Sequence, residues 1–306
     1  MAQTRGTWSE LYDNVEKMVM GVMFQQLKEL PPIYREYYNV KTSSKRFERI
    51  HSLVPFGDVP EKAEGATYTM DTLQPGYTKD FTHVEFGLGF EWTQTAEEDD
   101  QYDQLMQASK WLAFSARVVQ EKLAAAPLNN GFTTETTPDG VSFLNTAHVL
   151  KGGGTRRNRL ATDADLSVNS LTDVLTDLQT ETRDESDHLA APVNSLVMLI
   201  PPALEFLAAR ILESQLLQGV ADNDLNTIRT RRRWRLIVNP YLTDTDAWFV
   251  GAGDKNRHGL CTYQRVPVRV LPVREDAKTG NQIIKVRFRQ SWGPWSWQNW
   301  YGTSGG

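Results

Sequence analysis

The chain has 306 residues, of which 33 are Lys or Arg, 38 are Asp or Glu, and one is cysteine. The formal net charge of −5 argues against a dedicated nucleic-acid-binding protein, since such domains normally carry a basic excess. The single cysteine, Cys261, excludes an intramolecular disulfide and a cysteine-based zinc site. The length suits two packed lobes. The sequence has no signal-peptide pattern, and no apolar run approaches the roughly 18 residues of a membrane span. We therefore expect a soluble protein of a reducing compartment.

Residues 7–30 predict an amphipathic helix that ends at Pro31 and Pro32. Thr7 and Glu10 have the spacing of a capping box. The predicted apolar face comprises Leu11, Val15, Met18, Val19, Val22, Met23, Leu27 and Leu30. This helix either packs on its own domain or docks on a neighbouring copy, because methionine adapts to irregular surfaces.

Residues 55–79 are rich in Gly, Pro, Thr and charge, and they show little apolar periodicity. A two-faced strand follows at residues 83–92. One predicted face carries Val84, Phe86, Leu88, Phe90 and Trp92, and the other carries His83, Glu85, Gly87, Gly89 and Glu91. Because long structureless connections are uncommon inside compact domains, we expect an extended hairpin that reaches away from the body.

A long helix is predicted from Glu97 to about Ala126, roughly 40–45 Å in length. Its apolar positions are Leu105, Met106, Leu112, Ala116, Val119 and Leu123. The acidic run from Glu97 to Asp103 invites a metal-binding hypothesis, but acidic residues in a first turn are better explained by the positive end of the helix dipole.

From Leu166 onward the pattern becomes α/β, after a loop-rich connection at residues 142–158. Ser170 is predicted to cap a helix that buries Leu171, Val174, Leu175 and Leu178. A buried strand at 195–200 leads into a helix opened by Pro201-Pro202, with Leu204, Leu207, Ala208, Ile211 and Leu212 facing inward. Further strands are predicted at 235–238, 247–250, 266–273 and 283–292. The strands at 83–92 and 283–292 bracket this lobe, and we expect them to pair in one sheet.

No catalytic set is predicted. Asp244 and Asp246 form a DxD that would suit a divalent metal on a nucleotide-sugar substrate, but beside turn residues such aspartates commonly bond their own backbone. Residues 251–259 lack the GK[ST] ending of a phosphate-binding loop. His258 and Cys261 are close in sequence, whereas a catalytic cysteine usually draws its base from a distant segment. His148 has no visible carboxylate or cysteine partner, so a structural role is predicted.

Three basic clusters remain as candidate phosphate-binding groups. They comprise Lys41, Lys45, Arg46 and Arg49; Lys151, Arg156, Arg157 and Arg159; and Arg229, Arg231, Arg232, Arg233 and Arg235. In an acidic protein we expect instead that they pair with acidic stretches such as residues 97–103, within or between subunits.

Five segments, in this order, resemble recurring parts of the major capsid (major head) proteins of tailed bacteriophages. They are Phe56–Asp71, Thr78–Asp103, Asp139–His148, Asn239–Val250 and Phe288–Gly302. The first is similar to the extended loop of that family, and the second to its passage from the loop into a long spine helix. The terminal helix, protruding hairpin, oversized helix and inserted α/β lobe predicted from the residues agree with this resemblance.

The resemblance implies an α+β phage major-capsid fold with five regions. These are an N-terminal arm with an amphipathic helix (1–50), an extended loop and peripheral-domain strand (51–96), the spine helix and peripheral connection (97–160), an axial domain (161–275), and a returning strand with the C-terminus (276–306). Trp248 and Phe249 are expected in the core of the axial domain.

The implied function is self-assembly into hexamers and pentamers of an icosahedral head, in the virion, around double-stranded DNA bound without sequence specificity. Assembly in the bacterial host cytoplasm with a separate scaffold, portal and decoration proteins is implied, with no cofactor and no membrane. The candidate inter-subunit contacts are Met18, Val22, Phe56, Glu61, Lys62, Glu64, Tyr68, Arg156 and Arg157.

Two alternatives stay open. An encapsulin-like compartment shares the fold but encloses cargo enzymes, and the nucleic-acid content of the particle separates the two. A metal-dependent transferase that uses Asp244 and Asp246 belongs to a different class, and metal titration tests it.

Overall fold

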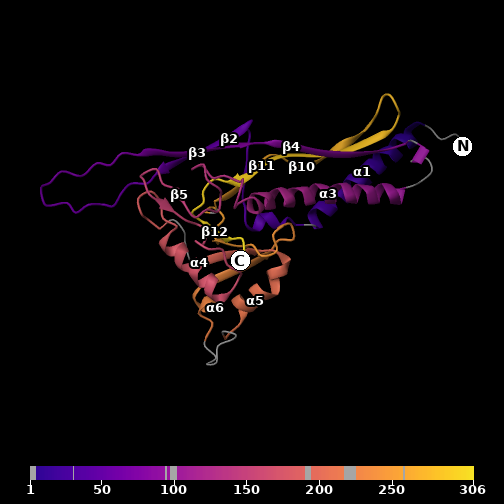
Figure 1. The fold of residues 1–306 in the computed structure, drawn as a ribbon. Coiled ribbons are helices and arrows are strands. Elements are labelled where there is room, and N and C mark those ends of the chain that lie inside the picture. The colour runs from indigo at the N-terminus through magenta and orange to yellow at the C-terminus, as the bar shows by residue number, and fades with distance from the viewer. Residues whose placement is uncertain are drawn as a thin grey trace.

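The computed structural model describes residues 5–29, 31–93, 95–96, 102–189, 194–216, 225–257 and 259–306. Its elements form an elongated upper body, a hairpin that projects from one end, and a wedge that descends from the middle (Figure 1). The α+β class predicted from the sequence is confirmed. Among the described helices, none has both the length and the apolar character needed to cross a bilayer.

The first sheet forms the upper body and has the strand order β1-β10-β11-β4. β1 spans Asn39–Thr42, β4 Val84–Trp92, β10 Leu260–Glu275 and β11 Gln282–Pro294. The predicted pairing of the strands at 83–92 and 283–292 is confirmed, because β11 runs antiparallel to β4 from Gln282↔Trp92 to Gln290↔Val84. The chain therefore leaves this sheet after β4 and returns to it about 170 residues later, after building most of the wedge.

Two long helices cover one face of the first sheet. α1 spans Arg5–Glu29 and α3 spans Tyr102–Asn129, so α3 is roughly 42 Å long. Both lie along the sheet (Figure 1). The core between them is apolar and contains Val19, Met23, Trp92, Leu105, Leu112, Ala113, Ala116, Val270, Ile284 and Val286. The side chains of residues 5–16, which include the predicted Thr7–Glu10 capping box, are not described, and Leu30 and the acidic residues 97–101 lie outside the described residues.

Not every residue on a predicted apolar face is buried. Val84 and Leu88 share the predicted apolar face of β4, yet they are 53% and 56% exposed because β4 is the outermost strand of the sheet. Met18 belongs to the predicted apolar face of the first helix, yet it is 50% exposed, since Val19 and Met23 make the contact with α3 and the sheet.

The second sheet forms the wedge and has the order β12-β9-β7-β8. β7 spans Ser195–Ile200, β8 Arg233–Val238, β9 Trp248–Ala252 and β12 Trp300–Thr303. β7 pairs parallel with β8 and antiparallel with β9. Three helices accompany it: α4 (Val168–Thr180), α5 (Glu205–Glu213, after the short 3-10 turn Pro202–Leu204) and α6 (Thr227–Arg231). β7 is almost entirely buried, as its uninterrupted apolar sequence predicts.

The N-terminus of α4 differs from the prediction. Ser167, not Ser170, is the N-cap, and its hydroxyl accepts a hydrogen bond from the Ser170 N–H. Ser170 is the third helical residue, and its hydroxyl accepts from the Ser167 N–H. The two serines thus form a capping box in which serine takes the place usually held by Glu or Gln.

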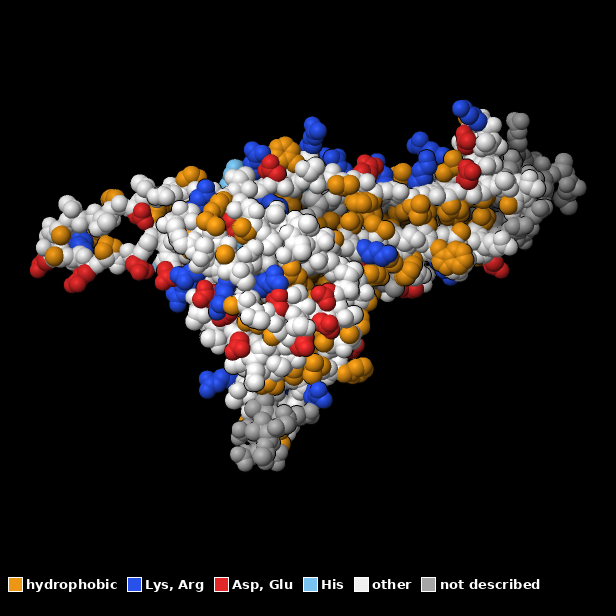
Figure 2. Space-filling model, in the orientation of Figure 1, with side chains coloured by type: hydrophobic (Ala, Val, Ile, Leu, Met, Phe, Trp, Pro, Cys, Tyr) orange, Lys and Arg blue, Asp and Glu red, His pale blue; other side chains and the backbone are white. Residues whose placement is uncertain are grey.

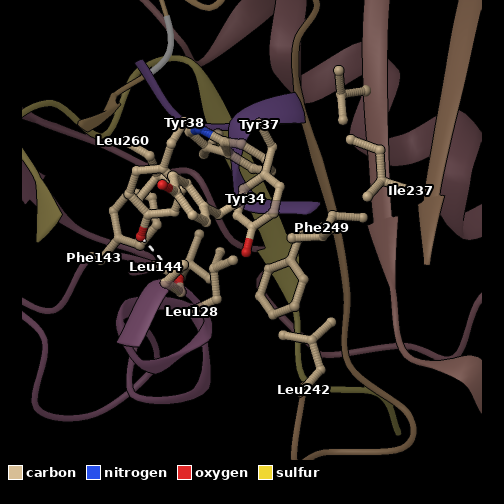
Figure 3. Close-up of a cluster of buried hydrophobic side chains, with 14 of the residues drawn as sticks. Tyr34, Tyr37, Tyr38, Leu128, Phe143, Leu144, Ile237, Leu242, Phe249 and Leu260 are labelled. Carbon is tan, nitrogen blue, oxygen red and sulfur yellow. Dashed lines mark hydrogen bonds between the residues drawn. The ribbon is translucent and has the colours of Figure 1, made fainter. Parts of the chain in front are cut away.

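A third core joins the upper body to the wedge. It centres on the tyrosines of the short 3-10 helix Ile33–Glu36 and the residues after it, with Tyr34, Tyr37 and Tyr38 at most 1% exposed. Around them pack Leu128 of α3, Phe143, Leu144 and Phe249 (Figure 3), and Trp300 belongs to the same buried cluster. Because one apolar cluster draws on both sheets and on α3, the two parts form one packed unit.

Candidate inter-subunit surfaces

The projecting hairpin is the most solvent-exposed part of the chain. β2 (Phe47–Val54) pairs antiparallel with β3 (Gln74–Thr82), and residues 55–73 between them form neither helix nor strand. Every residue from 55 to 75 is exposed. Five large apolar side chains are among them: Phe56 (55%), Val59 (96%), Tyr68 (77%), Met70 (86%) and Leu73 (54%). The extended hairpin predicted from the sequence is confirmed.

The base of the hairpin is fixed to the body by polar contacts. The Arg49 guanidinium donates two hydrogen bonds to the Asp80 carboxylate across the ladder, both 2.6 Å long. The Ser186 hydroxyl donates to the Pro55 carbonyl at 2.9 Å, and the Tyr77 hydroxyl donates to the Val149 carbonyl at 3.1 Å. These contacts set the direction in which the hairpin leaves the body (Figure 1).

The tip of the hairpin has little internal support. Near its base the Gly57 N–H donates to the Asp71 carboxylate at 3.1 Å, and the Lys62 ammonium lies 4.9 Å from the centre of the Tyr68 ring. Glu61 and Glu64 are exposed. An exposed cation–π contact is worth only about 0.5–1 kcal/mol, so the contacts within the loop stabilise it weakly.

A second apolar surface lies on the flank of the upper body, where the outer edge of β4 meets α3. Figure 2 shows apolar side chains gathered there. Leu88 of β4 is 56% exposed, and Trp111 and Phe114 of α3 are 63% and 47% exposed. Trp111 lines a groove of about 660 Å³ together with Phe90 and Trp92. Contiguous exposed apolar surface of this kind is typical of protein–protein interfaces.

The outer face of the first sheet, opposite the helices, is basic (Figure 2). The register places Lys285 opposite Gly89 and Arg287 opposite Gly87, so the two glycines of β4 leave a second groove of about 660 Å³ beside these cations. An added Cβ at Gly89 would lie 2.7 Å from the Ile284 carbonyl oxygen, so this position requires glycine.

The candidate contacts on α1 lie on its outer side. Met18 is 50% exposed and Val22 is partly buried. Phe24, which was not among the candidates, is 52% exposed. The sequence gives no signal for it, because its exposure next to the buried Met23 is seen only in the folded chain.

Arg156 and Arg157 pair within the chain. Arg156 donates to Asp187 at 2.7 Å and Arg157 donates to Asp177 at 3.0 Å. Both acidic partners lie downstream in the chain, in or just after α4, rather than in the acidic stretch at residues 97–103. In the other clusters, Arg49 pairs with Asp80, while Arg229 and Arg231 at the end of α6 are exposed.

The residues considered for catalysis do not assemble into a site. Asp244 and Asp246 are exposed, and the Asp246 N–H donates to the Asp244 carboxylate at 3.0 Å in a local turn. The described residues contain no group of three or more His, Cys, Asp or Glu that would hold a metal ion. Cys261 is fully buried, and burial raises the pKa of its thiol to about 12, while His258 lies outside the described residues.

Trp248 and Phe249, on β9, are 0% and 1% exposed and lie on opposite faces of the second sheet. The Trp248 indole N–H donates to the Ala164 carbonyl at 3.0 Å. The turn that contains Asp244 and Asp246 immediately precedes β9.

His148 has a carboxylate partner, contrary to the sequence prediction. Its Nδ1 lies 2.6 Å from Asp139 Oδ2, and both side chains are almost completely buried. Its Nε2 lies 3.0 Å from Asn158 Oδ1, and its ring stacks on Trp297 with centroids 4.4 Å apart. Asp139 is nine residues earlier in a turn, and periodicity gives no indication that this turn folds back on the histidine.

One family model matches this chain, and several solved structures share its fold. A family model described as phage capsid protein matches residues 76–303. No match is found among the curated proteins. Similar solved structures include Microbacterium phage Oxtober96 (TM-score 0.54, 13% identity, 90% of this chain and 92% of that one) and the capsid of a native GTA particle (0.55, 13%, 89% and 90%). A virus-like particle from Pyrococcus furiosus is also similar (0.53, 10%, 94% and 98%). At these identities the structural likenesses show the shared fold.

Proposed function

The chain belongs to the phage capsid protein family, and on this basis we propose that its copies form the hexamers and pentamers of an icosahedral head around double-stranded DNA. It is a major capsid protein, a structural component rather than an enzyme. The family assignment favours a phage head over an encapsulin-like compartment.

The observation that carries the proposal is the combination of a bare, extended hairpin with an apolar flank on the body. Val59, Tyr68 and Met70 are more than three-quarters exposed on a loop with almost no internal contacts. An isolated soluble protein gains nothing from such a loop, because exposed apolar side chains on an unstructured segment favour aggregation. In a shell, the loop of each copy is buried on its neighbour.

The loop lies over a neighbouring subunit, with Phe56, Glu61, Lys62, Glu64 and Tyr68 as its contacts. The flank formed by β4 and α3 supplies the apolar surface on which such a loop is buried. Because the base of the hairpin is held by the paired Arg49 and Asp80, the loop is presented in a fixed direction. Met18 and Val22 of the N-terminal arm contact a second neighbour.

The wedge packs around the five- and six-fold axes, and the upper body with α3 as its spine forms the peripheral part. The bounds expected for the axial domain, 161–275, need correction, because β10 (260–275) lies in the first sheet and β12 (300–303) completes the sheet of the wedge. A rigid wedge and body suit repeated use in near-equivalent settings, because the third core locks them together around Tyr34 and Phe249. The loop and the arm then absorb the differences between pentamers and hexamers.

Contact with packaged DNA is electrostatic and independent of sequence. Arg156 and Arg157 are paired within the chain, and the exposed Arg229 and Arg231 remain available for phosphate. Such contacts weaken with salt. Assembly takes place in the host cytoplasm with a separate scaffold, portal and decoration proteins, and the finished particle is the virion.

Deletion of the loop tests the proposal. Residues 58–71 are replaced by a short Gly-Ser turn, which spares both strands; a deletion extending to residue 78 would remove five residues of β3. We expect the variant to fold, because the removed residues are all exposed, and to show no shells by light scattering. Normal shells from this variant would show that assembly does not require binding of the loop to a neighbouring subunit.

A matched control addresses the transferase alternative. Asp244→Asn with Asp246→Asn keeps the acceptor of the local turn and removes both carboxylates. We expect normal shells from this double variant, and no heat when the unmodified protein is titrated with Mn²⁺ or Mg²⁺ in a calorimeter. Specific metal binding lost in the double variant would support the alternative.

A further inference from the structure

β4 is an unprotected sheet edge. It is the terminal strand of the first sheet, and in the part of the chain that the structure describes no strand pairs with its outer side. Natural edge strands are usually short, or carry lysine, proline or a bulge that prevents further pairing. β4 has nine residues, contains no Lys or Pro, carries Glu85 and Glu91 as its only charged side chains, and keeps continuous register with β11 from Val84 to Trp92. It therefore presents a regular row of backbone donors and acceptors.

The two faces of β4 differ in the neighbours that an added strand would meet. Leu88 and Phe90 face the helices, because their partners Val286 and Ile284 are buried beneath them. Beside them Trp111 of α3 lines the groove described above. On the other face Gly87 and Gly89 carry no side chains that would obstruct an approaching strand.

The loop contains a segment that matches this edge. Thr67–Leu73 reads TYTMDTL and combines β-branched and aromatic residues that favour extended backbone. In a strand, side chains two residues apart share a face, so Tyr68 and Met70 would lie together, with Asp71 on the opposite side. Tyr68 and Met70 are 77% and 86% exposed, and the segment belongs to no strand of its own chain.

Charge complements this fit. Residues 56–73 contain four acidic residues and one lysine. The outer face of the first sheet carries Lys285 and Arg287 beside the glycines of β4, and Arg269 lies opposite Arg287 on β10. Glu85 neutralises part of this charge, because it lies 3.2 Å from Arg287.

We propose that Thr67–Leu73 of one copy adds as a fifth strand to the free edge of β4 in a second copy. Tyr68 and Met70 pack on Leu88, Phe90 and Trp111, and Asp71 lies on the face that carries Lys285 and Arg287. The inference rests on the proposed function, because it specifies how the loop binds a neighbour.

The partner is a second copy rather than the same chain. The loop projects from one end of the upper body, and its tip points away from β4 and from the exposed stripe of α3 (Figure 1). The fixed base of the hairpin prevents it from folding back. Strand addition gives affinity through backbone hydrogen bonds, and alternate side chains fix the register. Each copy in a ring can therefore make the same contact, in which its loop binds the β4 edge of the next copy.

Hydrogen exchange by mass spectrometry tests the proposal on the full chain, before and after assembly. We expect amide exchange in the β4 peptide to slow by at least about tenfold in shells, together with exchange in residues 67–73. Tyr68→Ser with Met70→Ser should raise the protein concentration needed for half-assembly by at least about tenfold. The control Thr67→Ser with Thr69→Ser, on the opposite face, should leave it unchanged.

The outcomes separate the two proposals. Shells in which the β4 peptide exchanges as fast as in the unassembled protein would overturn strand addition while leaving the shell function intact. An equal effect of the two double variants would also overturn it, because it requires one face of the segment to carry the contact. Failure of the unmodified protein to assemble under any condition would instead count against the proposed function.

Discussion

At the scale of single residues, the buried His148–Asp139 pair is held by a complete set of hydrogen-bond partners. The Asn145 N–H donates to Asn158 Oδ1 at 2.8 Å, which fixes the orientation of that amide. Nε2 of His148 faces the same oxygen, so Nε2 donates. One further proton then lies between Nδ1 and the Asp139 carboxylate. The network ties the turn at Asp139 to the strand that begins at His148.

Two substitutions of Asp139 should therefore behave differently. Asp139→Ala leaves Nδ1 buried without a partner, and we expect it to lower the free energy of unfolding by about 3–5 kcal/mol. Asp139→Asn retains a donor for Nδ1 and an acceptor for the Thr137 hydroxyl, and we expect a loss within about 1 kcal/mol. Urea unfolding followed by tryptophan fluorescence measures both. Equal losses would show that the proton arrangement is wrong.

Glu121 of α3 has a buried carboxyl group whose two oxygens are not both hydrogen-bonded. Its Oε2 accepts a hydrogen bond from the Tyr34 N–H at 3.1 Å, whereas its Oε1 has no hydrogen-bond partner. Burial raises the pKa of this carboxyl from 4.5 to about 6, against the lowering effects of the backbone donors and of Arg117. The folded state therefore binds this proton more tightly than the unfolded state does.

The raised pKa of Glu121 makes the free energy of unfolding depend on pH. The contribution of Glu121 to stability is fully present below about pH 4.5 and is lost as the pH rises through about 6. The shift corresponds to about 2 kcal/mol at pH 7. We expect Glu121→Gln to remove this loss and to raise the free energy of unfolding at pH 7 by about 1–2 kcal/mol, because Gln still accepts from Tyr34.

The comparison is made between variants across pH 4–7, because other carboxyl groups contribute their own slopes. Glu213→Gln, at an exposed position on α5, serves as the control and should follow the unmodified protein. A difference between Glu121→Gln and the unmodified protein that stays constant over this range would contradict the assignment.

At the scale of elements, periodicity predicts what single segments bury. Strict alternation at 283–292 and the continuous apolar run at 195–200 correctly predict β11 and β7, and helical spacing correctly predicts α3. The exposure of Val84 and Leu88 does not follow from alternation, since it depends on β4 being outermost in the sheet. The cap at Ser167 was missed because serine replaces the usual Glu or Gln of a capping box.

The exposed stripe of α3 should matter for assembly and not for folding. Trp111 is 63% exposed, so we expect Trp111→Ser to change the free energy of unfolding by no more than about 0.5 kcal/mol. In a shell the same side chain is buried, and we expect the half-assembly concentration to rise by about tenfold or more. Light scattering against protein concentration measures it.

Lys110→Ser provides the control on the same helix, because Lys110 is exposed and lies outside the groove that Trp111 lines. It should assemble like the unmodified protein. A Trp111→Ser variant that unfolds more easily yet assembles normally would place this residue in the fold and not in an interface.

At the scale of the whole molecule, the sequence predicts the projecting loop but not the surface that we propose it binds. The lack of periodicity at 55–79 indicates the projecting loop, since such a segment cannot bury itself. The receiving surface combines Leu88, Trp111 and Phe114 from two elements, and only the folded chain brings them together. Likewise, the partners of Arg156 and Arg157 lie after and within α4, 31 and 20 residues away, where sequence spacing does not identify them.

The most direct test of the central claim is electron microscopy of the purified protein, expressed with its neighbouring genes where assembly requires them. A capsid subunit whose exposed hairpin binds a neighbour should form closed icosahedral shells built from five-fold and six-fold clusters. In these shells the density of the loop should lie over an adjacent subunit. A protein that remains a stable monomer under every condition of salt, concentration and co-expression would contradict the account.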